Sequence, residues 1–206
     1  MLFFAVVAAC ILSYEIFDAP AARFCASLNP TIKGFFDLIT RLGLSFPYQV
    51  AAVAAFVYFK FIKKDQIAAN AAVFLFAAVV FSGLANDLIK ALVGRTRPDL
   101  LLKEGIYWFK PFTNRYSYTS FPSGHANTIA AICYGLRLVT GRFTFVLWSI
   151  VLAVMASRVI VGAHFPSDVL FGAYLGTIVT ERLALIFEKR GVSIAVCEDR
   201  RYRSVL

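Results

Sequence analysis

Residues 67–93 read IAANAAVFLFAAVVFSGLANDLIKALV, and this segment indicates the class of fold to expect. No charged side chain occurs in it before Asp87. An α-helix needs about 20 apolar residues to cross the hydrocarbon core of a bilayer. We therefore predict a membrane-spanning helix over residues 67–93 that becomes polar in its last turns, at Asn86, Asp87 and Lys90.

The composition of the whole chain has the same character. Of its 206 residues, 60% are hydrophobic and only 16% are charged, and the mean hydropathy is +0.73. Soluble domains carry about 25% charged residues, so this is the composition of a membrane protein. The net charge of +9 does not indicate a nucleic-acid partner, because the basic residues fall mainly between apolar runs, where they set topology or bind anionic headgroups.

The same hydropathy argument predicts further spans, so the expected fold is an all-α integral membrane bundle of about six transmembrane helices in one domain, residues 1–206. The other five predicted spans are residues 2–17, 46–62, 122–137, 143–161 and 165–187. Residues 18–45 could hold a helix lying in the membrane interface. Residues 94–121 are rich in basic and aromatic residues that suit the headgroup layer, and a charged tail is predicted over residues 188–206.

Six spans with cytoplasmic termini would place the end of the third and fifth spans, and the start of the fourth and sixth, on the outer face. Slightly more basic residues then fall on the cytoplasmic side, as the positive-inside rule requires. The short chain favours a bacterial protein. We therefore predict a multi-pass protein of the bacterial inner membrane whose site opens on the periplasmic or extracellular face.

Polar residues within a membrane protein are costly and usually mark function. In this chain they gather where the third and fifth predicted spans end and the fourth and sixth begin, which is the same level of the membrane. They fall in three motif segments that also contain both histidines of the chain. These segments are residues 90–98 (KALVGRTRP), 122–125 (PSGH) and 157–168 (SRVIVGAHFPSD).

The second motif predicts an anion site. Pro122 suits the first turn of a helix, which would leave the backbone N–H groups of Ser123, Gly124 and His125 pointing outward at the positive end of the helix dipole. Three cations from the other motifs would add to this site, and their geometry suits a phosphate group better than a carboxylate. They are Lys90, Arg97 and Arg158.

The third motif predicts a nucleophile. His164 and Asp168 are four residues apart, with Pro166 between them at a predicted helix start. The Asp168 carboxylate can accept one ring N–H of His164 and leave the other nitrogen free to attack. His125 is then available to protonate the leaving oxygen. No set of metal ligands is present and the four cysteines contain no CxxC pair, so neither a metal nor another cofactor is expected.

These three motifs resemble the signature motifs of the type 2 phosphatidic acid phosphatase superfamily, which also includes bacterial acid phosphatases and vanadium haloperoxidases. The resemblance covers residues 90–168, and the predicted spans extend it over most of the chain. It implies a phosphohistidine on His164, oriented by Asp168, with His125 as the acid. It also implies that the phosphoryl group is held by Lys90, Arg97, Ser123, Gly124 and Arg158. The membrane spans make the chain similar to the lipid phosphatases of the superfamily.

Several alternatives stay open at this level. The substrate could be undecaprenyl diphosphate, phosphatidylglycerophosphate, phosphatidic acid or a phosphate of lipid A. A lipid phosphotransferase would use the same residues, a haloperoxidase would bind vanadate in the same cradle, and a membrane scaffold or transporter would not use the histidines. As structural alternatives, Asp87 could pair with Lys90, and Arg158 with Asp168. The loop cations could bind a headgroup or face solvent, and they are Lys103, Lys110 and Arg115.

Overall fold

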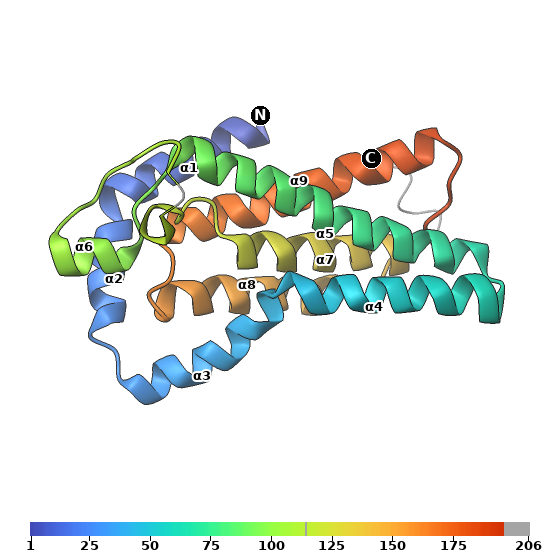
Figure 1. Ribbon diagram of the computed structural model, residues 1–206, viewed down its shortest axis with the longest axis horizontal. Coiled ribbons are helices and arrows are strands. Elements are labelled where there is room, and N and C mark those ends of the chain that lie inside the picture. The colour runs from blue at the N-terminus through green and yellow to red at the C-terminus, as the bar shows by residue number, and fades with distance from the viewer. Residues whose placement is uncertain (114, 196–206) are drawn as a thin grey trace.

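The computed structural model describes residues 1–113 and 115–195, and helices dominate both ranges (Figure 1). In chain order the α-helices are α1 (Leu2–Ile16), α2 (Asp18–Ala26), α3 (Pro30–Thr40), α4 (Ser45–Val57), α5 (Gln66–Val93), α6 (Pro98–Glu104), α7 (Gly124–Thr140), α8 (Thr144–Ile160) and α9 (Pro166–Lys189). Short turns of other helix types are η1 (Arg41–Gly43), η2 (Tyr58–Lys63, a π-helix that continues α4) and η3 (Tyr116–Tyr118).

Helix α7 lies at the centre of the bundle and packs against α5, α8 and α9. Small side chains allow this close packing, as is usual between membrane helices. A Cβ atom on Gly176 of α9 would lie 2.2 Å from the carbonyl oxygen of Asn127, and one on Gly172 would lie 2.5 Å from that of Ser123. The start of α7 is therefore held in backbone contact with the first three turns of α9, which brings two of the predicted motifs together.

Helices occupy all six segments that are predicted to span a membrane. By length and apolar composition, three helical segments could cross a bilayer: residues 30–63, α5 and α9. A fourth is added if α1 and α2, which meet at a bend of 56°, form one span, and α8 is apolar but shorter. The all-α membrane bundle is thus confirmed, while the number of six spans stays a prediction.

The segment between the first two predicted spans forms two helices, α2 and α3, where one interfacial helix was expected. Helix α3 leads through the turn η1 into α4, so that residues 30–63 form one long helical path. Gly43 in this turn lies directly against His125, because a Cβ atom there would be 2.6 Å from the His125 Cβ. The turn η1 therefore forms one wall beside the predicted acid.

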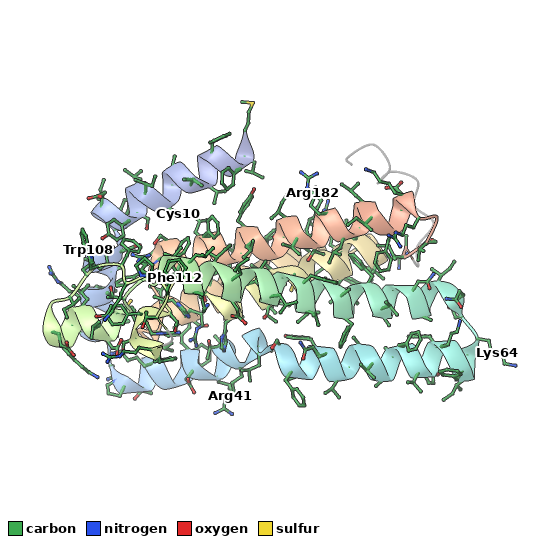
Figure 2. All side chains as sticks on the ribbon, turned by 45° about the horizontal axis from the view of Figure 1, so that its top comes forward. Cys10, Arg41, Lys64, Trp108, Phe112 and Arg182 are labelled. Carbon is green, nitrogen blue, oxygen red and sulfur yellow. The ribbon has the colours of Figure 1, made fainter. Side chains whose placement is uncertain are left out.

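The connection 94–121 folds back onto the end of α5. Thr96 N donates to the Trp108 carbonyl oxygen at 3.1 Å, and Lys110 N donates to that of Gly94 at 2.6 Å. Trp108 and Phe112 are exposed at this end of the bundle, while Lys64 lies at the opposite end (Figure 2). Exposed aromatic residues at one end of the bundle are compatible with the predicted contact with headgroups, which stays a prediction.

The predicted charged tail begins later than residue 188, because α9 continues to Lys189. Lys189, the last residue of α9, and Arg190, which follows it, are both exposed, and residues 196–206 of the predicted tail lie outside the described residues.

Candidate active site

Four segments that are far apart in the sequence meet at one end of the bundle. They are the end of α5 with the residues that follow it, the start of α7, the end of α8 and the start of α9. Lys90 Nζ of α5 donates to the carbonyl oxygen of Pro122, and Arg97 Nη1 donates to that of Ala163 at 2.9 Å. The fold therefore brings the three predicted motifs together.

His164 and Asp168 lie at the start of α9, and Pro166 is the first residue of this helix, as predicted. The His164 Nδ1 atom lies 3.7 Å from Asp168 Oδ2, which is too long for a hydrogen bond. Asp168 Oδ2 instead accepts from Ser120 Oγ at 2.5 Å and from the backbone N–H of Phe165 at 2.8 Å. The predicted hydrogen bond is therefore not formed in this structure, although the carboxylate lies beside the ring.

His164 is only 4% exposed. Burial lowers the pKa of His164 to about 3, against the opposing attraction of the Asp168 carboxylate. An imidazole attacks only through a neutral nitrogen, so at neutral pH the ring is in its nucleophilic form. Its Nδ1 atom is buried and has no hydrogen-bond partner in residues 1–113 and 115–195.

Among the described residues, the three predicted phosphate-binding cations donate only to neutral oxygen atoms. Arg97 donates to the carbonyl oxygens of Tyr116, Ala163 and Thr119 at 3.0, 2.9 and 3.2 Å. Arg158 donates to Thr40 Oγ1 at 2.8 Å, and its Nε atom is buried without a partner in the described part of the chain.

None of these cations forms an ion pair with a carboxylate of the described residues. The alternative ion pairs are also not formed, because Asp168 pairs with Arg95 and Lys90 contacts Pro122 in place of Asp87. Three positive charges without anionic partners, close to one another and partly buried, are costly unless an anion binds among them.

The start of α7 differs from the prediction in two respects. Pro122 precedes the helix, Ser123 is its N-cap residue and Gly124 is its first residue. The backbone N–H of Ser123 is not free, because it donates to the carbonyl oxygen of Asp168 at 3.0 Å. The Ser123 hydroxyl, in contrast, is buried and has no hydrogen-bond partner in the described residues. Gly124 keeps the backbone open, with Lys90 Nζ 3.9 Å from the position of its missing Cβ.

A cavity of about 390 Å³ opens beside His125, between α4, α5 and α7. Two glycines, Gly83 of α5 and Gly43 of η1, form part of its wall, and no side chain extends from them into the cavity. Two buried amide side chains, Asn86 and Asn127, also line the cavity. The Oδ1 atoms of both have no hydrogen-bond partner within the described residues. The cavity can thus hold a group that carries hydrogen-bond donors next to His125.

Sequence reasoning missed a buried charge network that supports Asp168. Arg95 Nη1 donates to Asp168 Oδ1 at 2.6 Å, and Arg95 Nη2 donates to Asp18 Oδ2 at 2.7 Å. Ser120 completes the network from the other side of Asp168. The position of Arg95 within the motif segment 90–98 indicates that it belongs to the site. Nothing in the sequence, however, connects it with Asp18.

The fold and the site define a helical membrane protein with a cluster of buried or half-buried cations beside a buried histidine at one end of its bundle. Comparison with protein families then gives its identity: the chain belongs to the PAP2 superfamily, whose family model matches residues 71–191. This match contains all the predicted site residues and leaves out α1 to α4.

Two curated relatives of the chain are lipid A phosphatases. A lipid A 1-phosphatase of Rhizobium johnstonii is 32% identical over 95% of this chain and 84% of its own length. A lipid A 4′-phosphatase of Porphyromonas gingivalis is 30% identical over 73% of this chain and 64% of its own length. Among solved structures, a transmembrane PAP2-type phosphatidylglycerolphosphate phosphatase from Bacillus subtilis covers 97% of both chains with a TM-score of 0.66 and 22% identity.

The family assignment and the prediction of a bacterial membrane phosphatase are confirmed by these comparisons. The structural likeness shows the fold. The roles of the individual site residues, the lipid substrate and the membrane face stay predictions.

Proposed function

We propose that the protein hydrolyses a phosphate monoester of lipid A through a phosphohistidine intermediate on His164. The observation that carries the proposal is the set of cations without carboxylate partners beside a neutral, buried histidine. Lys90, Arg97 and Arg158 can surround a phosphate dianion and stabilise the charge of its transition state. The Rhizobium relative, which matches nearly the whole chain, supports lipid A 1-phosphate as the substrate.

In the first step, the lone pair of His164 Nε2 attacks phosphorus while the bond from phosphorus to the leaving oxygen breaks. The bonding electrons move to the leaving oxygen, and His125 gives it a proton, which this ring carries once the bound phosphate dianion offsets the three cations beside it. The ring of His164 gains positive character as the new N–P bond forms. Asp168, held beside the ring by Ser120 and the backbone N–H of Phe165, stabilises that character.

In the second step, a water molecule attacks the phosphorus of the phosphohistidine. Neutral His125 accepts a proton from this water, the electrons of the N–P bond return to His164, and inorganic phosphate leaves. An acceptor alcohol or lipid phosphate in place of water would make the protein a phosphotransferase with the same first step. The two activities differ only in the product, which is inorganic phosphate or a new phospholipid.

The test is phosphate release by the detergent-purified protein from lipid A 1-phosphate, lipid A 4′-phosphate, undecaprenyl diphosphate, phosphatidylglycerophosphate and phosphatidic acid, with and without EDTA. We expect release chiefly from lipid A 1-phosphate, unaffected by EDTA. Release from another member of the panel would reject the proposed substrate. Turnover that yields a new phospholipid and no inorganic phosphate would replace hydrolysis by phosphotransfer.

The cavity beside His125 supports a leaving group with hydrogen-bond donors. The amide of Asn127 is oriented by its Nδ2 atom, which donates to Ser82 Oγ at 3.2 Å and so leaves Oδ1 as an unused acceptor. Asn86 adds a second buried acceptor to the same cavity. The acylated sugar of lipid A carries hydroxyl and amide N–H groups that could satisfy both acceptors, whereas a polyprenyl chain carries none.

Replacing Asn86 with Leu, which has a similar volume, should raise the KM for lipid A 1-phosphate by about 3- to 10-fold, the effect of one lost hydrogen bond. The inhibition constant of inorganic phosphate, which has no leaving group, should stay unchanged. Steady-state kinetics on the purified variant measure both values. A KM that does not move, or an equal change in phosphate inhibition, would rule out a contact between Asn86 and the leaving group.

We also infer that the site opens on the periplasmic side of the membrane. Trp108, in the connection 94–121, and Lys64, between η2 and α5, are exposed at opposite ends of the bundle (Figure 2). Lys64 has two lysine neighbours, Lys60 and Lys63, and such a basic cluster favours the cytoplasmic side.

Cysteine labelling tests this orientation in a Cys197→Ser background, since Cys10, Cys25 and Cys133 are buried. In intact spheroplasts, a membrane-impermeant maleimide should label Trp108→Cys and should label Lys64→Cys only after permeabilisation. The reverse pattern would place the site in the cytoplasm.

A further inference from the structure

A buried charge network joins the first helices of the chain to Asp168. Asp18 is the first residue of α2, at the bend that follows α1, and it is completely buried. Figure 1 shows α2 at the same end of the bundle as the start of α9. Asp18 Oδ1 accepts from Ser13 Oγ at 2.7 Å and from the backbone N–H of Ser167 at 3.1 Å. Its Oδ2 atom accepts from Arg95 at 2.7 Å and from the Ser167 hydroxyl.

Arg95 is shared between two carboxylates. Its Nη1 atom donates to Asp168 Oδ1 and Ser167 Oγ, each at 2.6 Å, and its Nη2 atom donates to Asp18 and, at 2.9 Å, to the hydroxyl of Tyr107. The guanidinium is 2% exposed and lies 4.5 Å from the ring centroid of Phe165, so water does not screen its charge. The side chain is thus fixed on both sides.

The charges of this network do not balance. Arg95 supplies one positive charge, while Asp18 and Asp168 supply two negative charges, all of them buried. No other ion pair involves Asp18 or Arg95 in the described part of the chain. The nearest group that can supply the missing positive charge is His164, whose ring lies beside Asp168. That ring gains positive charge when it bonds to phosphorus.

We propose that Asp18 is a positioning residue for the reaction at His164. By neutralising part of the Arg95 charge, Asp18 leaves the Asp168 carboxylate with unbalanced negative charge facing the imidazole. The network becomes electrically balanced when His164 carries the phosphoryl group. Removing Asp18 would let Arg95 neutralise Asp168 fully, and the positive charge on the His164 ring would then lose its stabilisation.

This inference rests on the proposed role of His164. The test therefore uses whichever lipid phosphate the wild-type protein hydrolyses, and His164→Ala serves as the inactive control. Asp18→Asn keeps the shape of the side chain and removes its charge. We expect kcat to fall about 10- to 100-fold with KM within about twofold of the wild-type value, because the charge acts in the transition state and not on bound substrate. Glu15→Gln, an exposed neighbour on α1, removes the same charge and should not change kcat.

A double variant separates this role from a merely structural one. Asp18→Asn with Arg95→Gln removes both charges and so leaves no unpaired guanidinium in the interior, which also keeps the test possible if Asp18→Asn alone does not fold. We expect the double variant to have a higher kcat than Arg95→Gln alone and, where it folds, than Asp18→Asn alone. If Asp18 only supports the fold, the second substitution should reduce activity further.

The outcomes are distinct. An unchanged kcat in folded Asp18→Asn, or a double variant less active than Arg95→Gln, would overturn the role of Asp18 while the wild-type activity and the inactive His164→Ala variant still supported the proposed function. Wild-type turnover in His164→Ala would overturn the proposed function itself, and with it the basis for Asp18.

Discussion

His164→Ala should lose phosphate release by about 10⁴-fold or more, since removing the nucleophile of a covalent mechanism leaves only binding and charge stabilisation to act. The loss should appear in kcat, because the cations that we propose hold the phosphoryl group stay in place. Phosphate release by the purified variant, measured with the lipid that the wild type hydrolyses, checks this directly. The affinity for inorganic phosphate should change by less than about tenfold.

A phosphoenzyme trap adds an independent readout. Wild-type protein quenched in base during turnover should carry a phosphoryl group that is lost when the sample is then acidified, as expected for an N–P bond. His164→Ala should carry none. His125→Ala should still form some phosphoenzyme from a substrate with a good leaving group, because such a group needs no proton from His125. Turnover by His164→Ala near the wild-type rate would reject the nucleophile.

The helices and the three motifs could be predicted from the sequence because each depends on local pattern. Apolar runs such as residues 67–93 specify a membrane helix wherever they occur, and α5 begins and ends within a residue of that prediction. Pro166 marks the start of α9 in the same local way. The motifs meet because α7 and α9 pack at their glycines, and the sequence shows the residues but not this crossing.

The parts that the sequence did not predict depend on contacts between distant segments. From its place in the motif alone, Arg95 could have been a fourth cation of the phosphate site, and only the fold shows that it faces Asp18 and Asp168 instead. In the same way, the backbone N–H of Ser123 was expected to face the substrate. It is used by the carbonyl oxygen of Asp168, because α9 begins directly beside α7. Burial of polar groups forces such pairings, but many partners are compatible with one sequence.

Arg97→Lys should lower kcat/KM by about 10²- to 10³-fold, the range found when one donor to a developing negative charge is removed. The charge is kept, so the loss would come from the shape of the guanidinium. Arg97 uses Nε, Nη1 and Nη2 to bind three carbonyl oxygens, and its guanidinium carbon lies 3.9 Å from the ring centroid of Tyr116. A lysine ammonium has three donors but no planar fork, so it cannot hold these partners and a phosphate oxygen at once.

The position of Arg97 explains why the effect should be large. Its contacts tie the loop residues Tyr116 and Thr119 to Ala163, the residue before the proposed nucleophile. One side chain therefore sets both the cover of the site and the place of His164, so its replacement should raise KM and lower kcat together. Arg41→Lys is the matched control, because Arg41 is exposed and its nearest carboxylate, on Asp37, is 4.0 Å away. If Arg97→Lys behaved like Arg41→Lys, the site would need only a positive charge there, and the carbonyl contacts of the guanidinium would have no part in catalysis.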